Sequence, residues 1–237
     1  AFKDAGIDRV VLLEFGARLA QMSAEAFVQR LLLDGLGVRY LLVGDDFRFG
    51  HGRSGDIELL RRAGALHGFA VENLNTYMLD AERVSSTRIR AALGAGDLET
   101  ARQLLGRSYR ICGRIGHGDQ RGRRIGFPTA NIDLHRRVSP LRGVFAVQVL
   151  GLPEGPWPGV ANIGTRPTVT GDPRYLLEVH LFGFAREIYG EHVQVEFRHT
   201  LRDERRFASF EDLRRQIELD SRVARELLGV PAADASA

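Results

Sequence analysis

The pattern of apolar residues changes near residue 107, and this change constrains the fold more than any other feature. Before it, short strand-like apolar runs alternate with segments of helical periodicity, which is typical of a doubly wound α/β sheet. After it, short β-rich segments follow one another through Gly/Pro turns, which predicts a small antiparallel β-barrel closed by a helix. The sequence therefore predicts two domains, residues 1–107 and 108–230.

Local signals give approximate bounds for the elements. In the first domain we expect a strand-like run at 9–15, a helix from Ser23 to about Gly35, a strand at 38–43, a helix at 56–65, a strand at 69–74 and helices at 85–93 and 97–105. In the second we expect strands at 108–113, 143–150, 159–163, 176–182 and 193–201. The last helix should start at an N-cap, Ser209, and bury an apolar stripe made of Phe210, Leu213, Ile217, Val223 and Leu227.

Residues 113–131 (GRIGHGDQRGRRIGFPTAN) combine five glycines and four arginines with a final Pro-Thr-Ala-Asn. Glycine lets peptide N–H groups come close to a phosphate. If the chain after Pro128 is extended, Thr129 and Asn131 point to the same face. A hydroxyl and an amide oxygen suit Mg²⁺ that is shared with substrate phosphates, so this segment predicts phosphoryl transfer from a nucleotide. The alternative is a surface hairpin that leads into a strand.

The strand at 176–182 (LLEVHLF) alternates, so that Glu178 and His180 share the face opposite its apolar residues. A carboxylate at this place could orient an attacking hydroxyl and accept its proton. The alternative is the exposed polar face of a barrel strand.

Two further places in the second domain have a double interpretation. The segment 160–168 (VANIGTRPT), with Asn162, Gly164 and Arg166, is either a flap over a substrate or a rigid turn. Arg202 is either a charged rim residue or a clamp for an anionic or polar ligand.

In the first domain, the segment 84–90 (VSSTRIR) places hydroxyls and guanidinium groups at a helix start, where phosphates bind well. The alternative is a serine N-cap with surface arginines. The loop 44–55 interleaves Phe47 and Phe49 with arginines. These rings could stack on a planar ligand, or one buried phenylalanine could anchor an ordinary loop.

Composition excludes several classes. Lys3 is the only lysine, so the chain contains neither a Walker A loop nor the strand lysine of protein kinases. A single cysteine, Cys112, excludes a disulfide framework and fits a reducing cytosol. The net charge of +3 gives no argument for nucleic acid, and no apolar run approaches the length of a bilayer span. We therefore expect a cytoplasmic protein without a nucleic-acid or membrane partner.

In their order along the chain, these motifs resemble those of the bacterial bifunctional riboflavin kinase/FMN adenylyltransferases. The resemblance rests on VGDDFRFG (43–50), VSSTRIR (84–90), the segment 113–131, GVANIGTRPT (159–168), LEVHLF (177–182) and LRDERRF (201–207). Several motifs in the right order are far more specific than any one of them.

The resemblance implies a C-terminal module that phosphorylates the ribityl 5′-hydroxyl of riboflavin from Mg·ATP. It implies that Thr129 and Asn131 bind the metal and that Glu178 is the catalytic base. The implied ATP-binding residues are Gly116, Gly118, Gly122, Arg123, Gly126 and Thr129. The implied flavin-binding residues are Asn162, Gly164, Arg166 and Arg202. The N-terminal module resembles a nucleotidyltransferase that makes FAD from FMN, and its site residues here are Phe47, Phe49, Ser85, Ser86, Arg88 and Arg90.

One departure from the family is plain. Its members carry a His-x-Gly-His motif at the first strand-to-helix turn, and these 237 residues contain no such spacing. The chain also starts at Ala1 without methionine, so we expect a missing N-terminal portion, and formation of FMN without competent formation of FAD. The competing hypothesis is a nucleic-acid- or protein-binding barrel fused to a degenerate α/β domain. The oligomeric state stays open.

Overall fold

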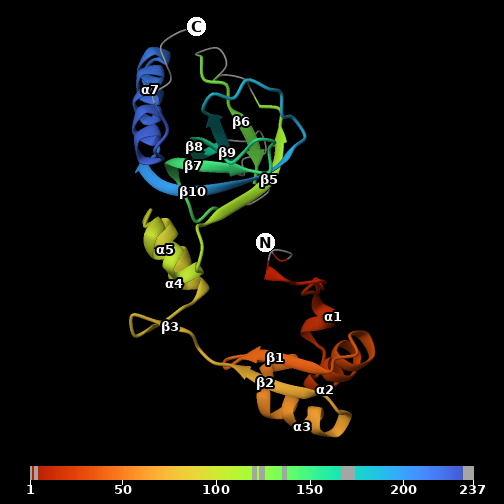
Figure 1. Ribbon diagram of the computed structural model, residues 1–237. Helices are drawn as coiled ribbons and strands as arrows, with labels where there is room; N and C mark the ends of the chain where they lie inside the picture. Colours follow the sequence, from red (N-terminus) through yellow and green to blue (C-terminus); the bar gives the residue numbers. More distant parts are fainter. Residues whose placement is uncertain are drawn as a thin grey trace. The chain divides into compact units, whose positions relative to one another are not determined.

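The computed structural model describes residues 2, 5–118, 122, 126–134, 138–166 and 174–231, with the side chains of Arg166 and Arg174 left out (Figure 1). The chain divides into two compact units, Ala1–Arg83 and Val84–Ala237. None of the helices in the described part combines the length and the apolar character that a bilayer span needs.

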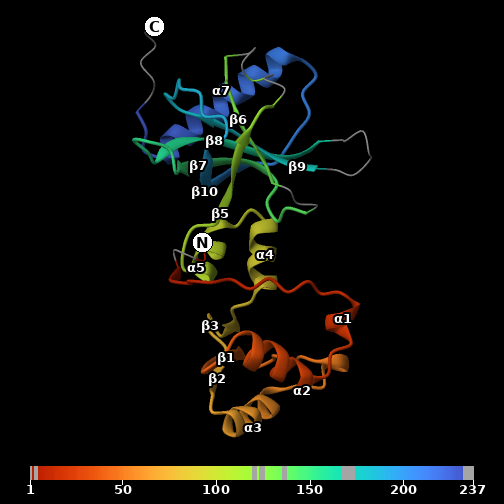
Figure 2. The same ribbon diagram turned by 90° about the vertical axis from the view of Figure 1, so that its right-hand side faces the viewer.

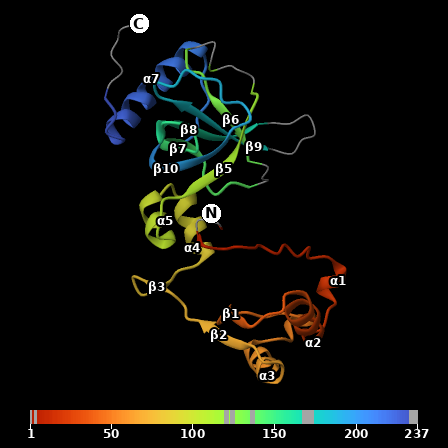
Figure 3. The same ribbon diagram turned by 45° about the vertical axis from the view of Figure 1, so that its right-hand side comes forward.

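The first unit is built around a small parallel sheet. Its elements are α1 (Ala17–Ala20), α2 (Ala24–Phe27), the π-helix η2 (Val28–Gly35), β1 (Tyr40–Gly44), η3 (His51–Arg53), α3 (Ile57–His67), β2 (Ala70–Leu74), β3 (Met78–Leu79) and β4 (Glu82–Arg83). Strands β1 and β2 pair in parallel, and α3 connects them and packs along β2 (Figure 3). Its core includes Val28, Leu32, Val43, Leu60 and Phe69. The strand–helix–strand order expected from the sequence is confirmed.

The apolar run at 9–15 corrects one expectation, because it forms no strand. Its side chains lie in solvent, with Leu12 91% and Phe15 81% exposed. Strand propensity alone does not make a strand, since each strand needs a neighbour that supplies a hydrogen-bond ladder. In the described part of this unit, the parallel sheet consists of β1 and β2.

The second unit is a closed barrel with helices around it (Figures 1 and 2). Its elements are α4 (Ser86–Gly94), α5 (Leu98–Leu105), β5 (Arg110–Gly116), β6 (Ala130–Asp133), β7 (Gly143–Leu150), β8 (Trp157–Arg166), β9 (Arg174–Leu181), β10 (His192–Arg202) and α7 (Phe210–Leu227). The strands close in the order β10-β5-β6-β9-β8-β7, and every pair is antiparallel. The predicted antiparallel barrel with its closing helix is confirmed.

Helix α7 covers the outer face of the barrel over β7, β8 and β10. The contact buries a small second core of Val144, Ala146, Val160, Phe182 and Ala224. Ser209 caps the helix as expected, because its hydroxyl accepts a hydrogen bond of 3.1 Å from the backbone N–H of Asp212.

The apolar stripe expected on α7 is only partly correct. Three of its members are exposed, namely Phe210 (69%), Val223 (37%) and Leu227 (45%). The residues that the helix buries are Asp220, Ser221 and Ala224. The expectation followed apolar residues alone, and it missed that a charged residue can belong to the buried face when it has a partner on the barrel.

Helices α4 and α5 pack with the barrel, because Leu93, Leu98 and Ala101 belong to its hydrophobic core. Their N-caps are Ser85 and Asp97, whose side chains accept from backbone N–H groups in the first turn. The domain boundary near residue 107 was inferred from the rhythm of the elements, and it stays a prediction. By packing alone, the second unit begins at Val84.

Candidate active site

Strand register brings three of the predicted site residues into one row. Asn131 on β6 lies opposite Glu178 on β9, and Glu178 lies opposite Asn162 on β8. Directly opposed residues of an antiparallel pair point to the same side of the sheet. The register continues from Asn162 through Val144 on β7 to Arg202 on β10. Residues from four separate predicted motifs therefore share one band around the outside of the barrel.

The alternation of β9 explains which side this band faces. Leu177, Val179 and Leu181 belong to the hydrophobic core of the barrel, with exposed fractions of at most 7%. Glu178 and His180 are therefore on the outer face, as the period of two predicted, and both are half-buried.

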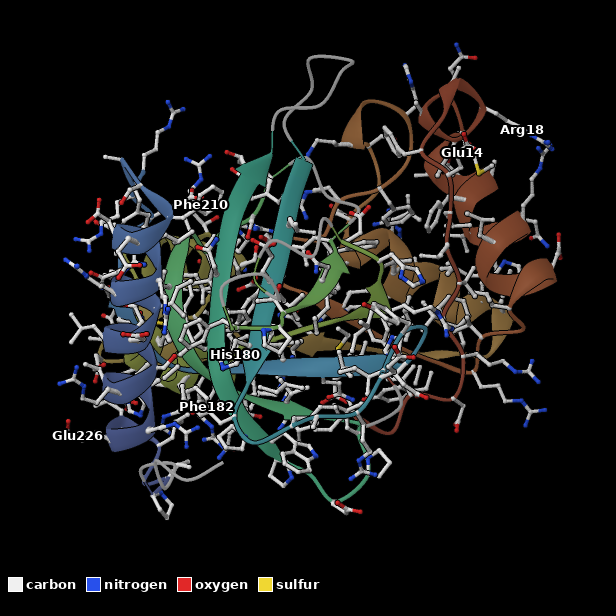
Figure 4. The ribbon with its side chains drawn as sticks, turned by 90° about the horizontal axis from the view of Figure 1, so that it is seen from above. Glu14, Arg18, His180, Phe182, Phe210 and Glu226 are labelled. Atoms are coloured by element: carbon white, nitrogen blue, oxygen red, sulfur yellow. The ribbon has the colours of Figure 1, made fainter. Side chains whose placement is uncertain are left out.

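A cavity of about 360 Å³ lies between this outer face and helix α7. Its barrel side presents Thr129, Asn162, Glu178, His180 and Arg202, among others. Its other wall includes Phe207, Phe210, Leu213 and Ile217. An apolar wall opposite a few convergent polar groups is typical of a small-molecule site, and the volume lies in the usual range. We call this space the α7 cavity; in Figure 4, His180 and Phe182 lie on the barrel side that α7 covers.

A second cavity, of about 370 Å³, lies next to the first. Its walls are Ile115 and Val179 from the barrel, the segment 128–130, and the segment 184–189 that follows β9. The ring of Tyr189 at its edge stacks on His117 with a centroid distance of 4.0 Å. We call it the 184–189 cavity. Thr129 lines both cavities, so two ligands bound in them would meet at this residue.

Asn131 has the properties of a ligand for a hard cation. It is 7% exposed, and its Nδ2 donates a hydrogen bond of 3.2 Å to the Thr129 carbonyl oxygen. Its buried Oδ1 has no hydrogen-bond partner among the described residues. Buried polar atoms are normally satisfied, so a lone acceptor next to a predicted metal ligand calls for a donor or a cation. An amide oxygen and a threonine hydroxyl are both ligand types that fit Mg²⁺.

The glycine-rich segment comes close to this amide. A Cβ atom at Gly118 would overlap the side-chain amide of Asn131, and one at Gly122 would overlap the carbonyl oxygen of Phe127. Gly126 has a φ of +86°, which also favours glycine. Gly116 ends β5 and faces open space. Arg123, a further predicted ATP-binding residue, lies outside the described residues.

Three of the four predicted flavin-binding residues lie at or next to the α7 cavity, and the side chain of the fourth is not described. Asn162 and Arg202 line the α7 cavity, and a Cβ atom at Gly164 would overlap the carboxylate of Glu204, another residue of its wall. The side chain of Arg166 lies outside the described residues. The described part of the segment 160–168 is neither the flap nor the turn that the sequence predicted, because residues 160–166 belong to the regular strand β8, whose ladder to β9 holds them. Asn162 of this strand lines the α7 cavity.

Arg202 is held by a residue that the sequence analysis missed. Its guanidinium donates hydrogen bonds of 2.7–3.1 Å to both carboxylate oxygens of Asp220 on α7, and Gln216 donates a further one of 2.6 Å. Asp220 is only 5% exposed. An aspartate at helical spacing from Leu213 and Ile217, facing a strand that ends in arginine, was the signal that could have revealed this pair.

The residues predicted for the nucleotide site of the first domain belong to both units. Phe47 and Phe49 lie in the first unit, stacked on each other at 5.5 Å, and Phe49 is buried beside Phe27. This favours the interpretation of Phe49 as the anchor of a loop.

The serines and arginines of VSSTRIR lie in the second unit. Ser85 caps α4 through the N–H of Arg88, and Arg90 donates to the hydroxyl of Ser86, both at 3.2 Å. This geometry is that of a serine N-cap, with Arg90 exposed and Arg88 half-buried. A role of these residues in binding phosphate stays a prediction.

An outer-face cavity with a carboxylate, a threonine shared with an adjoining second cavity, and an asparagine opposite the carboxylate fit a small-molecule phosphotransferase of the β-barrel class. Comparisons with known proteins agree. The riboflavin kinase family model matches residues 105–228, and the FAD synthetase family model matches residues 1–88.

The chain is 50% identical over 227 residues to the bifunctional riboflavin kinase/FMN adenylyltransferase of Escherichia coli K12, covering 96% of the chain and 72% of that protein. It is 51% identical over 222 residues to the protein of the same name from Pseudomonas fluorescens, covering 94% and 71%. A crystal structure of a macrolide-efflux protein from Streptococcus pneumoniae is 31% identical, with a TM-score of 0.75 over 94% of this chain and 72% of that chain.

The chain belongs to the family of bifunctional riboflavin kinase/FMN adenylyltransferases. Members of this family are enzymes that act on small molecules, namely ATP and the flavins riboflavin and FMN. This result does not favour the competing hypothesis of a nucleic-acid- or protein-binding barrel.

Proposed function

We propose that the α7 cavity and the 184–189 cavity together form the riboflavin kinase active site of this chain. The observation that carries the proposal is the register that sets Asn131, Glu178 and Asn162 side by side, with Thr129 lining both cavities. Two substrates can then occupy neighbouring spaces and exchange a phosphoryl group where the spaces meet. The contribution of such a site is mainly orientation and electrostatic stabilisation.

The flavin occupies the α7 cavity in this proposal. The aromatic and aliphatic wall of Phe207, Leu213 and Ile217 suits a flat apolar ring system, while Asn162 and Arg202 supply polar contacts. The ribityl chain then runs toward Glu178. The nucleotide occupies the 184–189 cavity, with its phosphates directed to Thr129 and to the glycine-rich segment.

Glu178 accepts the proton of the ribityl 5′-hydroxyl as the hydroxyl oxygen attacks the γ-phosphorus of ATP. The new O–P bond forms while the bond from the γ-phosphorus to the bridging oxygen breaks, and ADP leaves. Since the transition state of phosphoryl transfer is loose, the carboxylate orients the hydroxyl as much as it deprotonates it.

Thr129 and Asn131 are the residues that would hold a magnesium ion. The buried Oδ1 of Asn131, which has no hydrogen-bond partner in the described part of the chain, supports this assignment. When bound, the metal neutralises the charge of the phosphate oxygens. Both of these donors are neutral, so the substrate phosphates would supply the negative charge that the metal requires.

The test is direct. The chain is incubated with riboflavin, ATP and Mg²⁺, and the products are separated and identified by their absorbance and mass. We expect FMN and ADP in equal amounts. Absence of FMN, under conditions where the chain is folded by circular dichroism, would contradict the proposal.

A further inference from the structure

Among the described residues, His180 is the one imidazole in the wall of the α7 cavity, and the mechanism above gives it no role. Its Nδ1 lies 2.9 Å from the carbonyl oxygen of Pro128. A carbonyl can only accept, so Nδ1 carries the hydrogen and donates it. The contact joins β9 to the segment that leads into β6, 52 residues earlier in the chain.

This hydrogen bond lies just beyond the end of the backbone hydrogen-bond ladder between β6 and β9. The pairing of β6 with β9 ends at Ala130 and Val179. Thr129 comes next on one strand and His180 on the other, and Pro128 has no N–H with which to extend the ladder. Thr129 is therefore fixed on one side by the last backbone pair, and on the other by the side chain of His180.

The ring of His180 is itself held in place by aromatic neighbours. It meets Phe127 edge to face at a centroid distance of 5.2 Å and Phe182 at 5.9 Å. Arg225 of α7 lies over the ring of Phe182, at 4.2 Å. Burial, and to a lesser extent the charge of Arg225, lowers the pKa of His180, although the hydrogen bond to Pro128 acts in the opposite direction. A neutral ring with its hydrogen on Nδ1 agrees with the observed contact.

We propose that His180 is a positioning residue, which fixes the oxygen atoms of Thr129 and Asn131 for magnesium and phosphate by holding the Pro128 carbonyl. The proposal rests on the proposed function. It concerns the side chain beside the catalytic carboxylate rather than the carboxylate itself. Asn131 is included because its amide donates to the carbonyl of Thr129, so a shift of that peptide moves both ligands.

Three variants separate this role from packing. In His180→Asn, the amide nitrogen stands the same number of bonds from the backbone as Nδ1, so the donor is kept. In His180→Gln, the amide nitrogen stands where Nε2 was, and the donor to Pro128 is lost. His180→Leu removes the polar group but keeps a side chain of similar bulk. His192→Gln, at an exposed position of β10, is the control for substitution of a histidine.

The measurement is the affinity for ADP with and without Mg²⁺, determined by titration calorimetry on the full chain, together with riboflavin binding. In the original protein, Mg²⁺ should strengthen ADP binding. We expect this gain to fall about tenfold in the Gln and Leu variants, which corresponds to the loss of one hydrogen bond. It should stay within about threefold in the Asn variant, whose donor is retained. Because His180 also lines the α7 cavity, riboflavin affinity is measured separately in every variant, and the contrast between the Asn and Gln variants in the Mg²⁺ gain decides.

Equal gains in the Asn and Gln variants, whether both are normal or both reduced, would overturn the proposal. If the Leu variant does not fold, the Asn/Gln contrast still decides. Failure of the proposed function looks different: the original chain would then make no FMN, or its ADP affinity would not respond to Mg²⁺. Suppose instead that the original chain makes FMN and binds ADP more tightly with Mg²⁺, while the Gln variant shows the same gain. That result overturns the role of His180 and leaves the proposed function intact.

Discussion

The two units of the chain differ in how firmly they hold their candidate residues. In the second unit, six strands close into a barrel, and cross-strand pairs fix each outward side chain relative to its neighbours. In the first, the described parallel sheet has two strands, and apolar side chains such as Leu42 (50%) and Leu74 (57%) are exposed. Parallel sheets are normally covered on both faces. A closed ladder therefore brings candidate residues from distant segments into one row, whereas Phe47 and Phe49 of the first unit pack on each other within a single loop.

The largest effect expected from this comparison is on turnover. Glu178→Gln keeps the shape of the side chain but removes the base, so we expect kcat for FMN formation to fall by about 10²–10⁴-fold. Riboflavin and ADP affinities should stay close to those of the original protein. The control is Glu218→Gln, an exposed residue of α7. Normal turnover in the Glu178 variant would show that Glu178 is not the catalytic base and that the barrel site does not transfer the phosphoryl group as proposed.

A pair of matched core substitutions tests whether the two units are independent. Leu177 in the barrel and Leu60 in the first unit are both fully buried. Replacement of either by alanine should cost about 2–5 kcal/mol of unfolding free energy in its own unit. We expect Leu177→Ala to lower the midpoint at which kinase activity is lost on heating, and Leu60→Ala to leave that midpoint unchanged.

Calorimetry and activity measured over the same temperature range make the comparison. If Leu60→Ala lowers the midpoint of activity loss as much as Leu177→Ala does, the two units unfold together, and the contrast drawn above is wrong.

A smaller effect should distinguish two neighbours of Glu178. Asn131→Ala removes a predicted metal ligand, so the Mg²⁺ concentration for half-maximal activity should rise about tenfold, the equivalent of about 1.4 kcal/mol. Asn162→Ala, on the other side of Glu178, should instead raise KM for riboflavin and leave the Mg²⁺ requirement unchanged. The same response in both variants would mean that Asn131 and Asn162 do not have separate roles, one in metal binding and the other in flavin binding.

Much of this arrangement could be predicted from the sequence, because it depends on local periodicity. The alternation in LLEVHLF predicted that Glu178 points out of the barrel, and Ser209 predicted the start of α7. The succession of short β-rich segments without intervening helices predicted the antiparallel barrel. These features follow from propensity, capping and the period of a strand, which a single segment contains in full.

The rest depended on contacts between distant segments. The buried pair of Arg202 and Asp220 joins a strand to a helix, and neither residue alone reveals it. The run at 9–15 has the composition of a strand, but the described sheet gives it no partner. The 184–189 cavity was missed because its wall is a connection without a motif. Register could not be predicted for the same reason, and register is what places Asn131 beside Glu178.

The central claim is that Thr129, Asn131 and Glu178 surround one point where a phosphoryl group is transferred. The most direct test is a crystal structure of the chain with riboflavin, ADP and Mg²⁺. The account predicts a magnesium ion about 2.1 Å from the Thr129 hydroxyl and from Asn131 Oδ1. It also predicts the ribityl 5′-hydroxyl within hydrogen-bond distance of the Glu178 carboxylate. A flavin bound outside the α7 cavity, or a metal ion held by other side chains, would contradict it.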